Sequence, residues 1–180
     1  MTNLTLYNSF KGQMQTGDCL LWQSRSIIGW LIRFFSKADV NHAGLIIRPS
    51  EHGDLKNRRF TLEALEKGII LRLLSERLRS YEGRVWLYPL KDDFNDYRGD
   101  IAAWAIEKEG TPYDYKSLFR QIAGRVSADA KELFCSEFCF MAWKEVGIPI
   151  EDQKAPRPGD IPGLGIFKDP ILIYDDSGGE

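Results

Sequence analysis

The order of the apolar segments along the chain constrains the fold more than any other feature of the sequence. Between residues 19 and 90 these segments are short, rich in β-branched and aromatic residues, and separated by turn residues, as is typical of strands. The predicted strands cover residues 19–23, 40–47, 60–65, 69–73 and 84–90, and a last one covers 171–174. Two of them, 60–65 and 69–73, are joined by a tight Lys67-Gly68 connection, which favours antiparallel pairing.

Segments with helical spacing dominate the second half of the chain. Helices are predicted over residues 97–109, with Gly110 as the stop signal, over about 116–126, and over about 135–146. The last of these is apolar almost all round, which indicates deep burial. Because most strands precede most helices, the sequence predicts an α+β fold in which an antiparallel sheet packs against a helical layer.

The size of the chain indicates one domain. It has 180 residues, of which 43% are hydrophobic, and it contains neither an internal repeat nor a long linker. We therefore expect a single domain over residues 1–180, with its core at about 16–174 and a frayed tail at 175–180. An additional helix is expected from Ser24 or Ser26 to about residue 36.

Charge and hydropathy limit the partners that we expect. The net charge of −2 excludes a globally basic coat for nucleic acid. The first 18 residues lack the apolar region of a secretory signal, and the most apolar run, 27–35, is too short to span a bilayer, although it could lie on a membrane surface or line a lipid-like pocket. The sequence thus predicts a cytoplasmic protein without nucleic-acid partners or stable membrane insertion; a phage-encoded or otherwise delivered protein would have the same features.

Any thiol or imidazole chemistry must use five residues, since the chain has three Cys and two His. An odd number of Cys argues against a disulfide framework and favours free thiols in a reducing compartment. A metal site built from Cys135, Cys139 and His42 would have an incomplete ligand shell. The sequence therefore predicts neither a metal nor a cofactor.

Cys135 is the candidate nucleophile because it begins the third predicted helix. At a helix N-terminus, the dipole and the free N–H groups favour the thiolate, and the same N–H groups can bind an oxyanion. The alternative is an inert buried Cys, which is common in proteins. Cys19, in an apolar strand, and Cys139, one turn into the helix, fit that alternative.

His42 and Glu63 lie on neighbouring predicted strands and complete a possible triad. Strand alternation places His42 on one face with Gly44, which leaves space beside the imidazole ring. A carboxylate on the next strand, Glu63, could accept a ring N–H and set the tautomer of His42. A core histidine and a solvent-facing glutamate are the alternatives; Glu66 competes with Glu63, and His52 is expected to be solvated.

Several short motifs support this combination. They are Thr16-Gly17-Asp18, His42-Ala43-Gly44-Leu45, Leu62-Glu63-Ala64, Gly110-Thr111-Pro112-Tyr113-Asp114, Phe134-Cys135-Ser136-Glu137 and Pro158-Gly159-Asp160-Ile161. In this order they resemble the circularly permuted branch of the NlpC/P60 papain-like superfamily, in which His precedes Cys. The L-E-A context of Glu63 is most similar to the YiiX-like group; the lecithin retinol acyltransferase relatives usually carry a second His there.

The resemblance implies a permuted papain-like fold and a role for each matching residue. Cys135 would be the nucleophile, His42 its base and Glu63 the residue that orients His42. Tyr113, Ser136 and Asp18 would bind the substrate or its oxyanion. The implied function is a cysteine amidase or peptidase that cleaves an amide, peptide or lipid-linked acyl bond through a thioester. A thiol-dependent lipid acyltransferase and a non-catalytic ligand-binding domain remain the alternatives.

Overall fold

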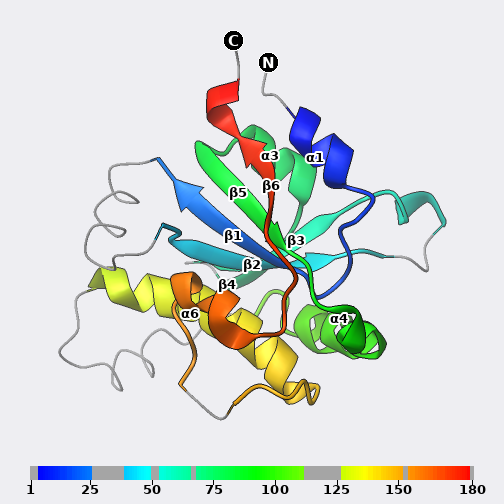
Figure 1. The fold of residues 1–180 in the computed structure, drawn as a ribbon, viewed down its shortest axis with the longest axis vertical. Helices are drawn as coiled ribbons and strands as arrows, with labels where there is room; N and C mark the ends of the chain where they lie inside the picture. Colours follow the sequence, from blue (N-terminus) through cyan, green and yellow to red (C-terminus); the bar gives the residue numbers. More distant parts are fainter. Residues whose placement is uncertain are drawn as a thin grey trace.

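A six-stranded antiparallel sheet organises the molecule (Figure 1). The computed structural model describes residues 4–25, 39–49, 53–65, 68–111, 127–151 and 154–178. The strand order is β4-β3-β2-β1-β5-β6. The strands are β1 (Cys19–Ser24), β2 (His42–Ile47), β3 (Phe60–Leu65), β4 (Gly68–Leu73), β5 (Gly83–Tyr88) and β6 (Ile171–Asp175). All six predicted strands are therefore confirmed, with ends that differ by no more than two residues.

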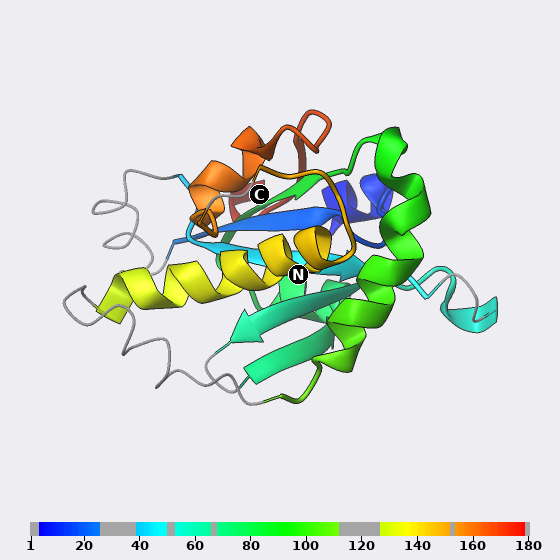
Figure 2. The same cartoon turned by 90° about the horizontal axis from the view of Figure 1, so that it is seen from below.

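Helices cover both faces of the sheet. They are α1 (Thr5–Phe10), α3 (Leu74–Arg79), α4 (Arg98–Glu107) and α6 (Ser127–Glu145). Short 3-10 helices are η1 (Gly53–Leu55), η2 (Asp92–Tyr97), η3 (Pro158–Leu164) and η4 (Asp176–Gly178). Figure 2 shows α6 running across one face, with α4 beside it.

Strand alternation explains how one sheet supports two cores. In β1, Cys19 and Leu21 pack with α4 and α6, whereas Leu20 and Trp22 pack with α1 and α3; all four side chains are fully buried. The sheet is thus buried on both faces. This is the α+β architecture that the order of apolar segments predicts.

The structure corrects the predicted start of the third helix. We expected that helix to begin at Cys135, but α6 begins at Ser127, so Cys135 is its ninth residue. The physical reason lies in the upstream residues 128–133, which are mostly strong helix formers and include neither Gly nor Pro. The nucleophile candidate therefore lies two turns inside the helix.

The core also extends beyond the predicted limits of 16 and 174. Tyr7 and Met14 are buried against the α3 side of the sheet. At the other end, Asp175 belongs to β6 and accepts a hydrogen bond from Arg84 Nε at 2.8 Å. Ser24 belongs to β1 and so does not begin the helix expected there. Residues 26–36 of that helix, the expected helix at 116–126 and the last two residues of the predicted tail lie outside the described residues.

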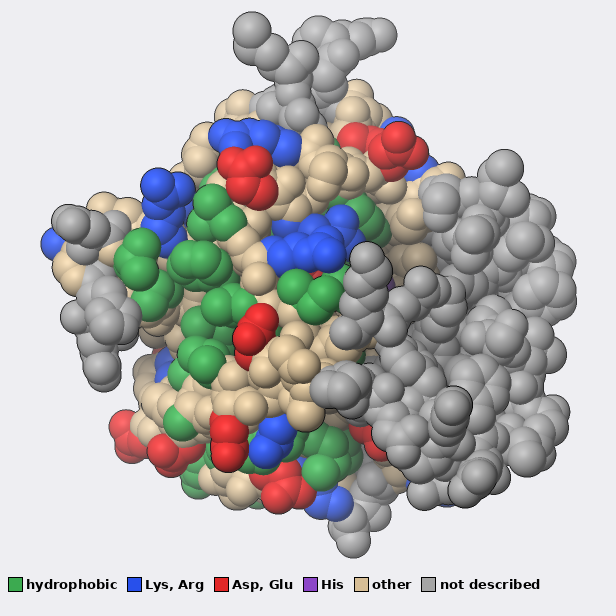
Figure 3. All heavy atoms as spheres, turned by 180° about the vertical axis from the view of Figure 1, so that it is seen from behind, with side chains coloured by type: hydrophobic (Ala, Val, Ile, Leu, Met, Phe, Trp, Pro, Cys, Tyr) green, Lys and Arg blue, Asp and Glu red, His purple; other side chains and the backbone are tan. Residues whose placement is uncertain are grey.

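The surface view shows how charges are distributed. On the face seen in Figure 3, Lys and Arg side chains alternate with Asp and Glu side chains over the described area. That area therefore lacks the extended positive field that attracts nucleic acid. None of the described helices is long and apolar enough to cross a lipid bilayer.

Candidate active site

Helix α6 presents Cys135 to the sheet. Its thiol is fully buried, and Cys135 belongs to the core cluster that α6 shares with Ala43 and Leu45 of β2. Because Cys135 lies inside the helix, its backbone N–H is expected to bond to the carbonyl four residues earlier. The expected position of this N–H at a helix N-terminus is therefore wrong, and its role toward an oxyanion stays a prediction.

Strands β2 and β3 bring His42 and Glu63 together. Leu45 pairs with Leu62 and Ile46 with Thr61; continuing this register by one residue sets Gly44 opposite Glu63. His42, two residues before Gly44, is then the diagonal neighbour of Glu63 on the same face. Its Nε2 lies 2.7 Å from Glu63 Oε2, within hydrogen-bond distance. The His42 side chain is 17% exposed, and that of Glu63 is fully buried.

Gly44 makes room for this contact. A Cβ at residue 44 would lie 2.9 Å from Thr61 Oγ1 and 3.0 Å from Glu63 Cγ, both closer than ordinary van der Waals contact. The sequence indicated open space beside the His42 ring at this glycine. In the structure, the carboxylate side chain of Glu63 lies against that space.

Substitution of Gly44 is expected to disturb this arrangement. Gly44→Ala should lower the free energy of unfolding by about 1–3 kcal/mol, because Thr61 and Glu63 must move to admit the methyl group. Urea denaturation measures the change. The matched control is Gly99→Ala in α4, where an added Cβ has nothing within 4 Å, and that variant should be no less stable than the wild type. Equal stability of the two variants would contradict the close contacts at Gly44.

The neighbours of His42 stabilise its protonated form. Burial lowers the pKa of His42, but the charge of the Cys135 thiolate and a hydrogen bond with that side chain raise it, as do the hydrogen bond and charge of Glu63. Together they raise the pKa of His42 to about 10. Since Nε2 is engaged with Glu63, Nδ1 is the ring nitrogen that remains for Cys135. At neutral pH, His42 is therefore an imidazolium beside the Glu63 carboxylate.

Glu63 remains ionised although it is buried. Burial raises the pKa of Glu63, but the hydrogen bond and charge of His42 and the charge and hydrogen bond of Arg77 outweigh that effect. The pKa of Glu63 therefore lies below its usual value. Arg77 donates through Nε to Glu63 Oε1 at 3.2 Å. Sequence reasoning missed Arg77, because nothing in its short helical segment indicates which arginine meets a carboxylate on another element.

The other two thiols belong to the core. Cys19 and Cys139 are fully buried, as the sequence indicated. Burial and a hydrogen bond with Cys19 raise the pKa of Cys139 well above its usual value. Cys139 is therefore a neutral thiol at physiological pH and a poor nucleophile.

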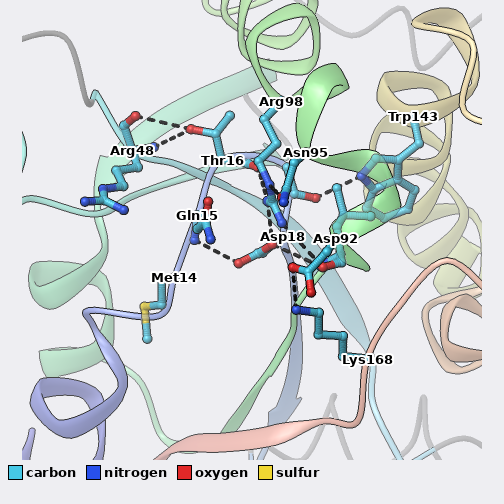
Figure 4. A network of polar contacts seen from close by, with 12 residues as sticks. Met14, Gln15, Thr16, Asp18, Arg48, Asp92, Asn95, Arg98, Trp143 and Lys168 are labelled. Carbon is cyan, nitrogen blue, oxygen red and sulfur yellow. Dashed lines mark hydrogen bonds and ion pairs between the residues drawn. The ribbon is translucent and has the colours of Figure 1, made fainter.

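Asp18 lies at the centre of a buried polar network (Figure 4). Its Oδ2 accepts the backbone N–H of Gln15 at 2.8 Å, and its Oδ1 accepts the N–H of Leu90 at 3.0 Å and Arg98 Nη1 at 2.8 Å. Trp143 of α6 donates to the neighbouring Gly17 carbonyl at 2.9 Å. These contacts join the start of β1 to α4 and α6. They give Asp18 a structural role, and its role toward a substrate stays a prediction.

The remaining predicted residues are placed only in part. Ser136 follows Cys135 and is fully buried. Tyr113, His52 and Glu66 lie outside the described residues. The structure thus brings together Cys135, His42 and Glu63, and it adds Arg77 to them.

Comparisons with known proteins identify the family of this chain. A family model described as "Permuted papain-like amidase enzyme, YaeF/YiiX, C92 family" matches residues 13–161. The crystal structure of the metalloprotein YiiX from Escherichia coli O157:H7 is similar in fold, with a TM-score of 0.56 and 17% sequence identity over 89% of each chain. A comparison with curated protein sequences gives no match. Within the described ranges, no group of three or more His, Cys, Asp or Glu residues could hold a metal ion. The side chains of these types in those ranges therefore do not form a metal site.

Proposed function

The chain belongs to the C92 family of permuted papain-like amidases, which are cysteine hydrolases, and on this premise we propose that Cys135, His42 and Glu63 are its catalytic triad. The substrate class that we propose is an amide, a peptide or a lipid-linked acyl group. The observation that carries the proposal is the position of His42, which contacts Glu63 through Nε2 and interacts with the Cys135 side chain. A nucleophile, a base and a residue that orients the base are the parts that covalent acyl transfer requires.

The proposed reaction has two steps. The Cys135 thiolate attacks the carbonyl carbon, the bond from that carbon to the leaving group breaks, and the His42 imidazolium gives its proton to the leaving group. A thioester on Cys135 results. Neutral His42 then removes a proton from water, the water oxygen attacks the thioester carbonyl, and the Cys135 thiolate leaves. The acid product is released, and the thiolate–imidazolium pair is restored.

The exposure of the site residues sets the proposed direction of approach. Cys135 has no exposed surface, whereas His42 exposes 17% of its side chain. The substrate carbonyl would therefore reach Sγ along the exposed edge of His42. Substrates with a slender acyl group are expected to fit this approach better than folded proteins.

Selective alkylation tests the proposed nucleophile. The native protein is treated with iodoacetamide at pH 7, and the modified residue is located by mass spectrometry. Cys135 should be modified first, because its thiolate is stabilised by the His42 imidazolium, while the buried core thiols Cys19 and Cys139 should react only after unfolding. The Cys139→Ala variant is the matched control and should retain the fast reaction. Slow and equal modification of all three thiols would refute the proposal.

The fate of the acyl group separates hydrolysis from transfer. The protein is incubated with short peptide amides or with a long-chain acyl lipid, and the mass of Cys135 is followed with and without an added amine. Release of free acid at the same rate in both cases supports a hydrolase. Passage of the acyl chain from Cys135 to the amine, in preference to water, would instead support the lipid acyltransferase.

A further inference from the structure

We propose that Arg77 is a positioning residue of this active site, which keeps Glu63 in one charge state and one orientation throughout the reaction. The inference rests on the proposed triad and extends it by one residue. Arg77 does not touch the reacting atoms and acts through Glu63 on His42.

The two oxygens of Glu63 have different partners. Oε2 lies 2.7 Å from His42 Nε2, and Oε1 accepts from Arg77 Nε at 3.2 Å. A carboxylate held at one oxygen can rotate about its last bond, whereas a carboxylate held at both oxygens has a fixed plane. Arg77 thereby directs Oε2 toward the imidazole ring.

Aromatic rings hold the guanidinium of Arg77 in place. It lies over the Trp22 ring, at 4.7 Å from the centroid, and over the Tyr81 ring, at 5.1 Å. The two rings meet edge to face at 4.9 Å. Trp22 pairs with His42 in the sheet, and the centroids of their rings are 6.4 Å apart. The Trp22 ring therefore lies beside both of the cationic side chains that contact Glu63, namely Arg77 and His42.

The charge of Arg77 matters because that of His42 changes during the reaction. When the imidazolium protonates the leaving group, Glu63 loses its nearest cation. A fully buried carboxylate without a cationic partner takes up a proton, and a protonated Glu63 would no longer accept the N–H that orients the ring. Arg77 stays charged at every step, because a guanidinium does not deprotonate in proteins. Arg77 therefore keeps Glu63 ionised, so that Glu63 can accept the ring N–H again when His42 is next protonated.

Within the part of the chain that the structure describes, the ionisable groups around Glu63 come from three elements. They are His42 of β2, Arg77 of α3, and the thiols of Cys135 and Cys139 of α6, while the partner of Glu63 in β4 is the apolar Ile70. Arg77 is the permanent cation among these groups. Its removal should therefore raise the pKa of Glu63, since burial already favours the neutral form.

A second arginine on the same helix provides a matched control. Arg79 follows Arg77 by two residues and forms an ion pair with Glu76 at the surface, where its side chain is 53% exposed. The side chain of Arg77 is 17% exposed. The two residues thus have the same charge and lie on the same helix, but Arg77 contacts Glu63, whereas the ion pair of Arg79 is with Glu76 at the surface.

The test compares Arg77→Met, Arg77→Lys and Arg79→Met. The rate constant for alkylation of Cys135 by iodoacetamide is measured from pH 4 to pH 10, and the stability of each variant is measured in urea. For Arg77→Met the acid limb should move up by about one pH unit, so that the rate at a given pH on that limb falls about tenfold, as expected when a buried carboxylate loses a cation. Arg77→Lys should recover part of both changes, and Arg79→Met should match the wild type.

A spectroscopic measurement distinguishes positioning from mere stabilisation. The ¹⁵N shifts of the His42 ring report its protonation and tautomer, and the chain has only one other histidine, so assignment is simple. In Arg77→Met, the His42 ring shifts should change over the same raised acid range in which the alkylation rate falls, because a protonated Glu63 no longer accepts the ring N–H. If Arg77→Met loses stability but keeps the wild-type alkylation profile and ring shifts, Arg77 is only structural. If Arg77→Met does not fold, Arg77→Lys decides the question by the same two measurements.

Failure of this inference differs from failure of the triad. If wild-type Cys135 is not selectively alkylated, or if His42→Ala leaves its rate unchanged, the triad itself is wrong. If both triad results hold and the Arg77 variants behave like Arg79→Met, only the role of Arg77 is refuted.

Discussion

Replacement of His42 by alanine is expected to slow alkylation of Cys135 at pH 7 by at least about 30-fold. The reason is the proposed thiolate–imidazolium pair: a thiol without such a partner, at the ordinary pKa of about 8.5, is only a few per cent ionised at that pH. The measurement is the iodoacetamide rate constant, with His52→Ala as the control that should react like the wild type.

The pH dependence of the wild type should have a defined sign. The folded protein raises the pKa of His42 to about 10, from an ordinary value of about 6.5, so the folded chain binds this proton more tightly than the unfolded chain. The contribution of His42 to the free energy of unfolding is therefore complete below about pH 6.5 and is lost as the pH rises to about 10. Hydrolysis should decline over the last part of that range, because the proton donor for the leaving group disappears. An unchanged slope of stability against pH in His42→Ala would contradict the ion pair.

Local patterns in the sequence were sufficient to predict the sheet and the contact between His42 and Glu63. Strand alternation placed His42 and Gly44 on one face of their strand, and Thr61 and Glu63 on one face of theirs. The observed register puts both pairs on the same face of the sheet. Such predictions succeed because the side-chain direction in a strand depends only on residue parity. The resemblance to the permuted papain-like family then selected Cys135 from three thiols.

Features that depend on contacts between distant elements were missed. The contact between Arg77 and Glu63 joins α3 to β3 across the face of the sheet, and no pattern within residues 74–79 indicates it. The start of α6 was misplaced for a different reason. The apolar pattern placed the helix start at about Cys135, although strong helix formers upstream allow the helix to begin at Ser127. Asp18, interpreted as part of a family motif, proved to be the centre of a buried network that no sequence pattern describes.

The largest loss of stability is expected from Arg98→Met. Arg98 Nη1 donates to Asp18 Oδ1 at 2.8 Å, and the side chains of Arg98 and Asp18 are 12% and 0% exposed. Removal of the guanidinium leaves a buried carboxylate without a cation, which typically lowers the free energy of unfolding by about 3–5 kcal/mol. Urea denaturation at pH 7 measures this change. The ion pair between Lys168 and Asp92 belongs to the same region but is exposed, so Lys168→Met should lower the free energy of unfolding far less than Arg98→Met.

The loss in Arg98→Met should also depend on pH. Burial raises the pKa of Asp18 above its usual value even though Arg98 lowers it, and removal of Arg98 leaves burial less opposed. An acid whose pKa is higher in the folded state binds its proton more tightly there, so the protein gains stability as the pH falls through that pKa. Arg98→Met should therefore recover part of its lost stability in mild acid, where Asp18 becomes neutral.

The double variant Asp18→Asn/Arg98→Met should lose less than the sum of the two single losses, because neither buried charge remains. Additive losses, or a loss in Arg98→Met that does not shrink as the pH falls, would show that the two charges do not interact across this network.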